Sequence, residues 1–198
     1  MSILRAALLC LLLIAQTVLA QEGGAYLERA GERVGVFEHE ALNYRLDLGG
    51  EAYTYIDFSR NAPDASFAAL RFSPNAFTVV VVEDLGLGVT AEQYAEVVQS
   101  AMEDKLSAEA DSVFKSFADI GARDERGMAI FQKTLHAEVG ATLITYVLST
   151  YVDGPRAYQL LTFASDVPDE AILAEANFVL SGFSVIDAEL NQHVVVEA

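Results

Sequence analysis

Cysteine is almost absent from this sequence, and tryptophan is absent altogether. The only cysteine among the 198 residues is Cys10, so the chain has no intramolecular disulfide, which needs two thiols. One cysteine also excludes a structural zinc site built from several thiolates. A folded domain in this chain must therefore be stabilised by its hydrophobic core rather than by covalent or metal cross-links.

Basic residues are also scarce. The chain has 12 Lys and Arg against 29 Asp and Glu, which gives a formal net charge of −17. Nucleic acid is not expected as a partner, because phosphate backbones are bound by clustered Lys and Arg. An anionic membrane surface is disfavoured for the same reason. The acidic residues indicate a charged, hydrated surface that keeps the protein soluble. The alternative is that they bind a cationic partner.

The first twenty residues have the pattern of a secretory signal peptide. Arg5 precedes an apolar stretch that runs from Ala6 to Ala15, and the small residue Ala20 ends the segment. The apolar stretch is about 10 to 12 residues long, whereas a helix needs roughly 20 to cross a bilayer. We therefore expect cleavage near Ala20 and a periplasmic or secreted protein. An uncleaved membrane anchor and a lipid anchor on Cys10 are the alternatives.

The rest of the chain divides into a lead-in segment, one domain and a tail. Residues 21–40 begin with a stretch rich in glycine and charge, which indicates a loosely held lead-in. Residues 41–186 carry alternating and continuous apolar runs, which predict a single α+β domain. Residues 187–198 are predicted to be a C-terminal tail.

Alternating or continuously apolar segments predict the β-strands of this domain. They cover residues 42–48, 52–58, 66–72, 76–83, 111–120, 128–139, 141–152 and 156–164. The last two are expected to be adjacent antiparallel strands joined at Asp153-Gly154. Both are nearly free of polar positions, which indicates strands inside a sheet that helices cover.

Two amphipathic segments predict the main helices. Thr90 and Gln93 form a capping box that opens a helix over residues 90–107. A second helix is expected from about Pro168 to Leu180, with acidic residues in its first turn. Because strands and helices do not alternate regularly, we expect an antiparallel sheet of about six to seven strands with these two helices packed on it.

The order of elements and a few short motifs resemble the PsbP/DcrB-like fold over roughly residues 40–186. The motifs are Tyr44–Gly50 at the first strand, the Thr-capped helix, Arg156-Ala157-Tyr158 and Ser181-Gly182-Phe183. The resemblance implies an exported or chaperone-like α+β domain of a group whose members are mostly uncharacterised. Members often carry a tryptophan after the first strand, and Tyr53 is expected to take that place here.

The sequence carries no recognisable catalytic motif. It lacks a nucleophile elbow, a P-loop, a zinc-protease helix and an EF-hand loop. His39 lies between two glutamates, but in an extended segment it would point away from both, so no metal site is expected there. His136 is expected to be an ordinary solvent-facing histidine of its strand, and His193 falls in the tail. A Ser-His-Asp arrangement would have to be assembled from distant residues.

We therefore interpret the chain as a non-catalytic exported binding or assembly factor of the cell envelope, with no catalytic, cofactor-binding or metal-binding residues. Its expected partner is another envelope or secreted protein, and Tyr53 and Tyr55 are the predicted exposed recognition patch. The alternative is a carrier of a small apolar ligand held between the sheet and a helix, because residues 76–83 and 141–164 are apolar on both faces. A second alternative is a hydrolase without a recognisable motif.

Overall fold

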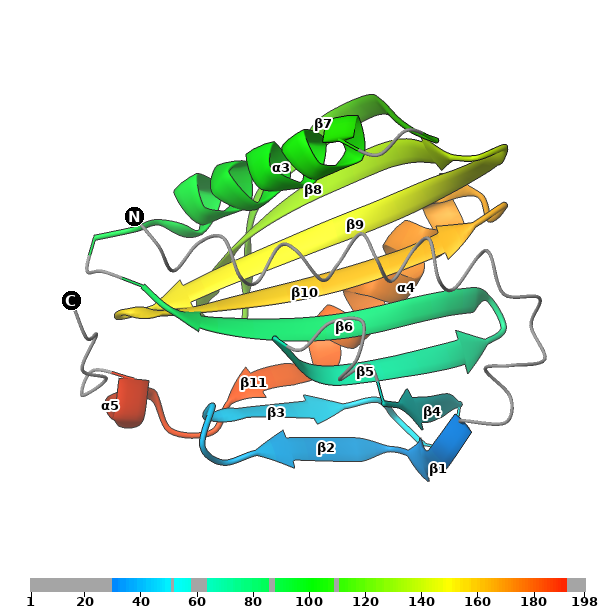
Figure 1. Cartoon of the computed structure of the whole chain (residues 1–198). Coiled ribbons are helices and arrows are strands. Elements are labelled where there is room, and N and C mark those ends of the chain that lie inside the picture. Colours follow the sequence, from blue (N-terminus) through cyan, green and yellow to red (C-terminus); the bar gives the residue numbers. More distant parts are fainter. Residues whose placement is uncertain (1–29, 51, 58–63, 86–87, 109–110, 192–198) are drawn as a thin grey trace.

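The computed structural model describes residues 30–50, 52–57, 64–85, 88–108 and 111–191. The signal peptide and cleavage site expected at residues 1–20 lie outside these described residues, as do residues 21–29 and 192–198, which include His193. The α+β fold class is confirmed, because the described chain forms two antiparallel sheets with helices packed on them (Figure 1).

The main sheet has eight strands in the order β1-β4-β5-β6-β10-β9-β8-β7. Their bounds are β1 (Ala30–Val34), β4 (Tyr53–Ile56), β5 (Ala65–Phe72), β6 (Asn75–Asp84), β7 (Ser112–Glu125), β8 (Met128–Val139), β9 (Thr142–Asp153) and β10 (Arg156–Ser165). The count exceeds the expected six to seven. One reason is that β1, which comes from the segment predicted to be a loose lead-in, pairs with β4 and extends the sheet.

The predicted hairpin in this sheet is confirmed. β9 and β10 agree to within one residue with the predicted strands 141–152 and 156–164, and they are joined at Gly154, which has a φ of 60°. Glycine suits this turn because it adopts positive φ without a steric penalty. β7 instead continues to Glu125, five residues beyond the predicted strand 111–120.

A second sheet has three strands in the order β11-β3-β2. They are β2 (Val36–His39), β3 (Tyr44–Asp47) and β11 (Phe183–Val185). The alternation predicted for β3 is confirmed, because Tyr44 and Leu46 are buried while Arg45 and Asp47 are exposed. The expectation of one sheet is wrong, however, because β3 pairs with β11 from the far end of the chain instead of joining the main sheet.

The described helices are α3 (Ala91–Ala108), α4 (Asp169–Gly182) and the short α5 (Ala188–Asn191). The capping box is confirmed: the N–H of Thr90 donates to Gln93 Oε1 at 3.0 Å, and the N–H of Gln93 donates to Thr90 Oγ1 at 3.2 Å. α5 lies in the segment predicted to be a tail, so the domain extends beyond residues 41–186 at both ends. None of the described helices is long and apolar enough to cross a membrane.

The two long helices cover opposite faces of the main sheet. α3 packs on β7, β8 and β9, and its Met102 shares a core with Leu161 of β10. α4 packs on β9 and β10, and its Val179 shares a second core with Leu160. Successive residues of one strand therefore belong to different cores, which explains why the central strands have so few polar positions.

A glycine sets the distance between α4 and the small sheet. A Cβ atom added to Gly182, the last residue of α4, would lie 1.9 Å from the carbonyl oxygen of Asp47 on β3. No side chain fits at that distance. Glycine at this position therefore allows the chain to pass from α4 into β11 close beside β3. In the motif Ser181-Gly182-Phe183, the central glycine thus has a steric role, because it leaves room for the backbone of β3.

Truncation of Leu148, which is fully buried, tests the assignment of the hairpin to the core. We expect Leu148→Ala to lower the free energy of unfolding by about 2 to 5 kcal/mol, the usual cost of such a cavity. Thr134→Ala, at a half-buried position on the opposite face, is the control and should cost less than about 1 kcal/mol. Urea unfolding measures both. Equal midpoints for Leu148→Ala and wild type would contradict the assignment.

Gly182→Ala tests the close contact between α4 and β3. The added methyl group would overlap the Asp47 carbonyl, so we expect the two elements to separate and the protein to lose at least about 1 to 3 kcal/mol of stability, as in overpacked cores. Ser181→Ala changes the preceding, exposed residue and is the matched control. A thermal unfolding midpoint for Gly182→Ala at or above that of Ser181→Ala would refute the steric role.

Candidate functional site

Of the two tyrosines in the predicted exposed patch, only Tyr55 is exposed. Tyr55 is 38% exposed, but Tyr53 is fully buried, so the expectation is wrong for Tyr53. The Tyr53 hydroxyl donates a hydrogen bond to Glu175 of α4, and the other Glu175 oxygen pairs with Arg71 at 2.5 Å. Burial, reinforced by the carboxylate, raises the pKa of Tyr53, so its hydroxyl remains a donor. Tyr53 therefore belongs to a buried tether that holds α4.

The two histidines within the described residues both have partners. His39 Nδ1 accepts a hydrogen bond from the N–H of Leu42 at 3.2 Å, which stabilises the turn after β2. His136 was expected to face solvent, but its side chain is only 21% exposed and contacts Ser116 and Asp169. The reason is that the first turn of α4 lies over this part of β8. In the described part of the chain, no three His, Cys, Asp or Glu side chains gather as metal ligands would.

β7 is an edge strand of the main sheet and carries exposed apolar side chains. Among the described strands β7 pairs only with β8, and three of its apolar side chains, Val113, Phe117 and Ile120, are 53%, 45% and 43% exposed. The pairing shifts register between Phe114 and Ser116 and again between Asp119 and Gly121. An edge strand offers backbone N–H and C=O groups to a further strand. β7 is therefore the candidate docking edge.

The α3 side of the sheet holds buried polar atoms without partners. Tyr146 of β9 and Gln159 of β10 are fully buried, and the Tyr146 hydroxyl and both polar atoms of the Gln159 carboxamide have no hydrogen-bond partner. Burial raises the pKa of Tyr146, so its hydroxyl is a neutral, unused donor. Because an unsatisfied buried polar group costs about 1 to 3 kcal/mol, such groups call for an explanation.

The side chains around these buried groups are apolar and aromatic. The Tyr146 ring lies 5.5 Å from that of Phe163, which stacks on Phe77 at 5.3 Å between ring centroids. This face continues from β10 over β6 and β5, and its side chains, among them Phe163 and Phe77, are buried. We refer to it as the α3-side face. Its side chains suit an apolar ligand that carries a hydrogen-bonding group.

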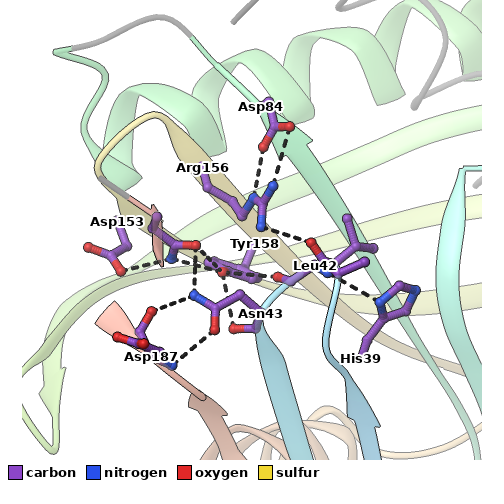
Figure 2. Close-up of polar contacts among 10 residues, drawn as sticks. His39, Leu42, Asn43, Asp84, Asp153, Arg156, Tyr158 and Asp187 are labelled. Carbon is purple, nitrogen blue, oxygen red and sulfur yellow. Dashed lines mark hydrogen bonds and ion pairs between the residues drawn. The ribbon is translucent and has the colours of Figure 1, made fainter. Parts of the chain in front are cut away.

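A polar cluster joins α5 and the small sheet to the main sheet (Figure 2). Asn43 Nδ2 donates to the Asp187 carbonyl at 2.6 Å, and the Asp187 N–H donates to Asn43 Oδ1 at 2.9 Å. Asn191 Nδ2 donates to Asp153 Oδ2 at 2.8 Å and to the Tyr158 hydroxyl oxygen at 2.9 Å. Burial raises the pKa of Tyr158 to about 12, which keeps this hydroxyl neutral.

The motif Arg156-Ala157-Tyr158 supplies the main-sheet side of this cluster. Arg156 Nε donates to Asp84 Oδ1 at 2.8 Å, and Arg156 Nη1 donates to the Ala41 carbonyl at 3.3 Å. Tyr158 also contacts the Leu42 carbonyl at 3.2 Å. Since these side chains bind the protein's own backbone and carboxylates, the cluster fixes the small sheet in place. We do not assign ligand binding to it.

The comparisons with known proteins place the fold. No family model and no curated protein matches the sequence. Among solved structures, cyanobacterial PsbP from Synechocystis sp. PCC 6803 matches with a TM-score of 0.58 at 12% identity, over 83% of this chain and 97% of that chain.

Two further structures match less well. LpqN, a Mycobacterium tuberculosis protein involved in cell envelope biogenesis, has a TM-score of 0.48 at 17% identity, covering 72% of this chain and 83% of LpqN. A Bacteroides thetaiotaomicron protein has a TM-score of 0.48 at 10% identity, covering 79% of this chain and 48% of its own. The match to cyanobacterial PsbP carries the conclusion: the chain has the PsbP/DcrB-like fold that its sequence resembles.

Proposed function

We propose that the protein is an exported binding factor of the cell envelope that docks an extended segment of another envelope or secreted protein along β7. The observation that carries the proposal is the exposed edge strand with its apolar side chains. The signal-peptide pattern of residues 1–20 supports export.

The chemistry of β7 suits recognition by strand addition. In this mode the backbone hydrogen bonds of the edge supply affinity, while alternating side chains supply specificity. Val113, Phe117 and Ile120 would provide the apolar contacts. Lys115 pairs with Glu138 at 2.7 Å and Asp119 with Lys133 at 2.8 Å, so these two charges on the edge already have partners within the protein. The net charge of −17 favours a partner segment that carries basic residues.

Lysine substitutions on the edge test this docking mode. We expect Val113→Lys combined with Ile120→Lys to reduce recovery of the partner about tenfold or more, because a loss of ~1.4 kcal/mol weakens binding tenfold. Both positions are exposed and lysine on an edge opposes further pairing, so stability should change little. The measurement is affinity capture from envelope extract at low salt, with the mature protein as bait and quantitative mass spectrometry as readout.

Leu190→Lys is the matched control, because Leu190 is 53% exposed on α5, far from β7 in Figure 1. This variant should capture the partner as well as wild type does. If wild type captures no reproducible partner, or the β7 double variant captures it undiminished, docking on β7 is rejected.

A second candidate function is supported by the α3-side face. Here the protein would carry a small apolar molecule, with the Gln159 carboxamide and the Tyr146 hydroxyl as its polar contacts. The ligand would then satisfy atoms that have no partner within the protein. Gln159 lies opposite Thr150 and Tyr146 opposite Phe163 in the β9–β10 ladder, so the two polar groups are four positions apart along the strands. At ~3.3 Å per residue the separation is about 13 Å, which suits an elongated molecule.

Gln159→Leu distinguishes a ligand-bearing face from an empty one. If the protein carries a ligand, native mass spectrometry of wild type should show added mass, and its occupancy should fall in Gln159→Leu and in Tyr146→Phe. Thr134→Ala on the opposite face should retain it. If wild type shows only the apo mass and Gln159→Leu raises stability by about 1 to 3 kcal/mol in urea, as removal of an unpaired buried group would, the carrier function is wrong.

A further inference from the structure

Three side chains from three separate elements form a hydrogen-bonded chain beside the exposed edge. Ser116 Oγ on β7 lies 3.2 Å from His136 Nδ1 on β8. His136 Nε2 lies 2.9 Å from Asp169 Oδ2 in the first turn of α4. The other carboxylate oxygen, Asp169 Oδ1, accepts a hydrogen bond from Thr145 Oγ1 at 2.9 Å.

The strand register produces this arrangement. Ser116 lies directly opposite His136 in the β7–β8 ladder, and His136 lies opposite Thr145 in the β8–β9 ladder. The three residues therefore form a row across neighbouring strands on one face of the sheet. α4 begins above this row and brings in Asp169. The bulge between Phe114 and Ser116 is part of the geometry, because it sets which β7 residue faces His136.

The hydrogen bonds define a role for each group. Slight burial would raise the pKa of Asp169, but the hydrogen bonds from His136 and Thr145 outweigh it and hold the pKa below its ordinary value. The ionised carboxylate favours a proton on His136 Nε2. Nδ1 is then the unprotonated nitrogen and can accept the hydroxyl proton of Ser116. A nucleophile, a base and an orienting carboxylate in this order are the general requirement for serine catalysis.

Ser116 is also accessible to a substrate. Its side chain is exposed, and Asp169 is 59% exposed, so the row opens to solvent rather than into the core. β7 has no described strand on its outer side, and the bulge takes backbone groups out of the ladder beside Ser116. An edge strand leaves part of its backbone N–H groups without a neighbouring strand, and such groups are the kind of donor that stabilises negative charge on a carbonyl oxygen.

We propose that Ser116, His136 and Asp169 form an acyl-transfer site that hydrolyses unhindered carboxylic esters. Ser116 Oγ attacks the ester carbonyl carbon while His136 Nδ1 takes the hydroxyl proton. The bond to the alcohol oxygen then breaks, and His136 returns the proton to the departing alcohol. Water attacks the acyl-serine with His136 again as base, and Ser116 recovers its proton as the carboxylic acid leaves.

This activity goes beyond the binding role, and it differs from the expectation that the chain is not an enzyme. That expectation depended on the absence of a nucleophile motif in the sequence. Residues 20 and 33 positions apart, on different elements, leave no such motif. The site lies on the open surface, so we expect the reactivity of the ester rather than its shape to decide which substrates react.

Active-site labelling tests the proposal directly. A fluorophosphonate probe should add its mass to wild type on the tryptic peptide Ser116–Arg123, in which Ser116 is the only hydroxyl-bearing residue. Ser116→Ala should not be labelled, and His136→Gln should be labelled far more slowly. Asp169→Asn should reduce labelling as well, because a neutral amide does not favour a proton on His136 Nε2 as the carboxylate does.

Hydrolysis of p-nitrophenyl acetate is the second readout. We expect wild type to exceed buffer alone and Ser116→Ala and His136→Gln to fall about a hundredfold or more, the usual contribution of a general base. Ser181→Ala, purified in the same way, is the control for contaminating esterase and should match wild type. If wild type is not labelled on Ser116, or if Ser116→Ala hydrolyses the ester at the wild-type rate, the proposal is overturned.

Discussion

The central strands β6, β9 and β10 are apolar on both faces, and the rest of the architecture follows from that constraint. A sheet with two apolar faces is stable in water only when each face is covered. α3 covers one face, and α4 with the small sheet covers the other. The hairpin of β9 and β10 contributes to both cores at once, so the two halves of the molecule share one set of strands.

α4 joins the parts of the fold that are distant in sequence. Its first turn supplies Asp169 to the row of polar residues on β7, β8 and β9. Its middle supplies Glu175 to Tyr53 and Arg71, and its last residue, Gly182, permits the close approach of β3. A buried carboxylate needs a paired charge to be tolerated, so the Glu175 contacts specify where α4 lies as well as holding it there.

The two faces of the sheet offer different chemistry. The α3-side face is apolar with unused hydrogen-bonding atoms, which suits retention of an apolar molecule. The α4 side near β7 is polar and open, and it places a serine, a histidine and a carboxylate in contact. Between them runs the exposed edge of β7, which suits an extended polypeptide. Because Ser116 lies on β7, a segment docked along this edge and a substrate at Ser116 would compete for the same surface.

The α+β class, the two long helices, the capping box at Thr90 and the hairpin at Gly154 could be predicted from the sequence. These features depend on local periodicity and turn chemistry, which act over a few residues. The second sheet, the strand count and the burial of Tyr53 could not be predicted, because they depend on distant parts of the chain. β3 pairs with β11, and Tyr53 bonds Glu175 of α4. The contacts of His136 with Ser116 and Asp169 could not be predicted from the sequence either. They depend on cross-strand register and on the position of a helix, which bring together residues that no local pattern connects.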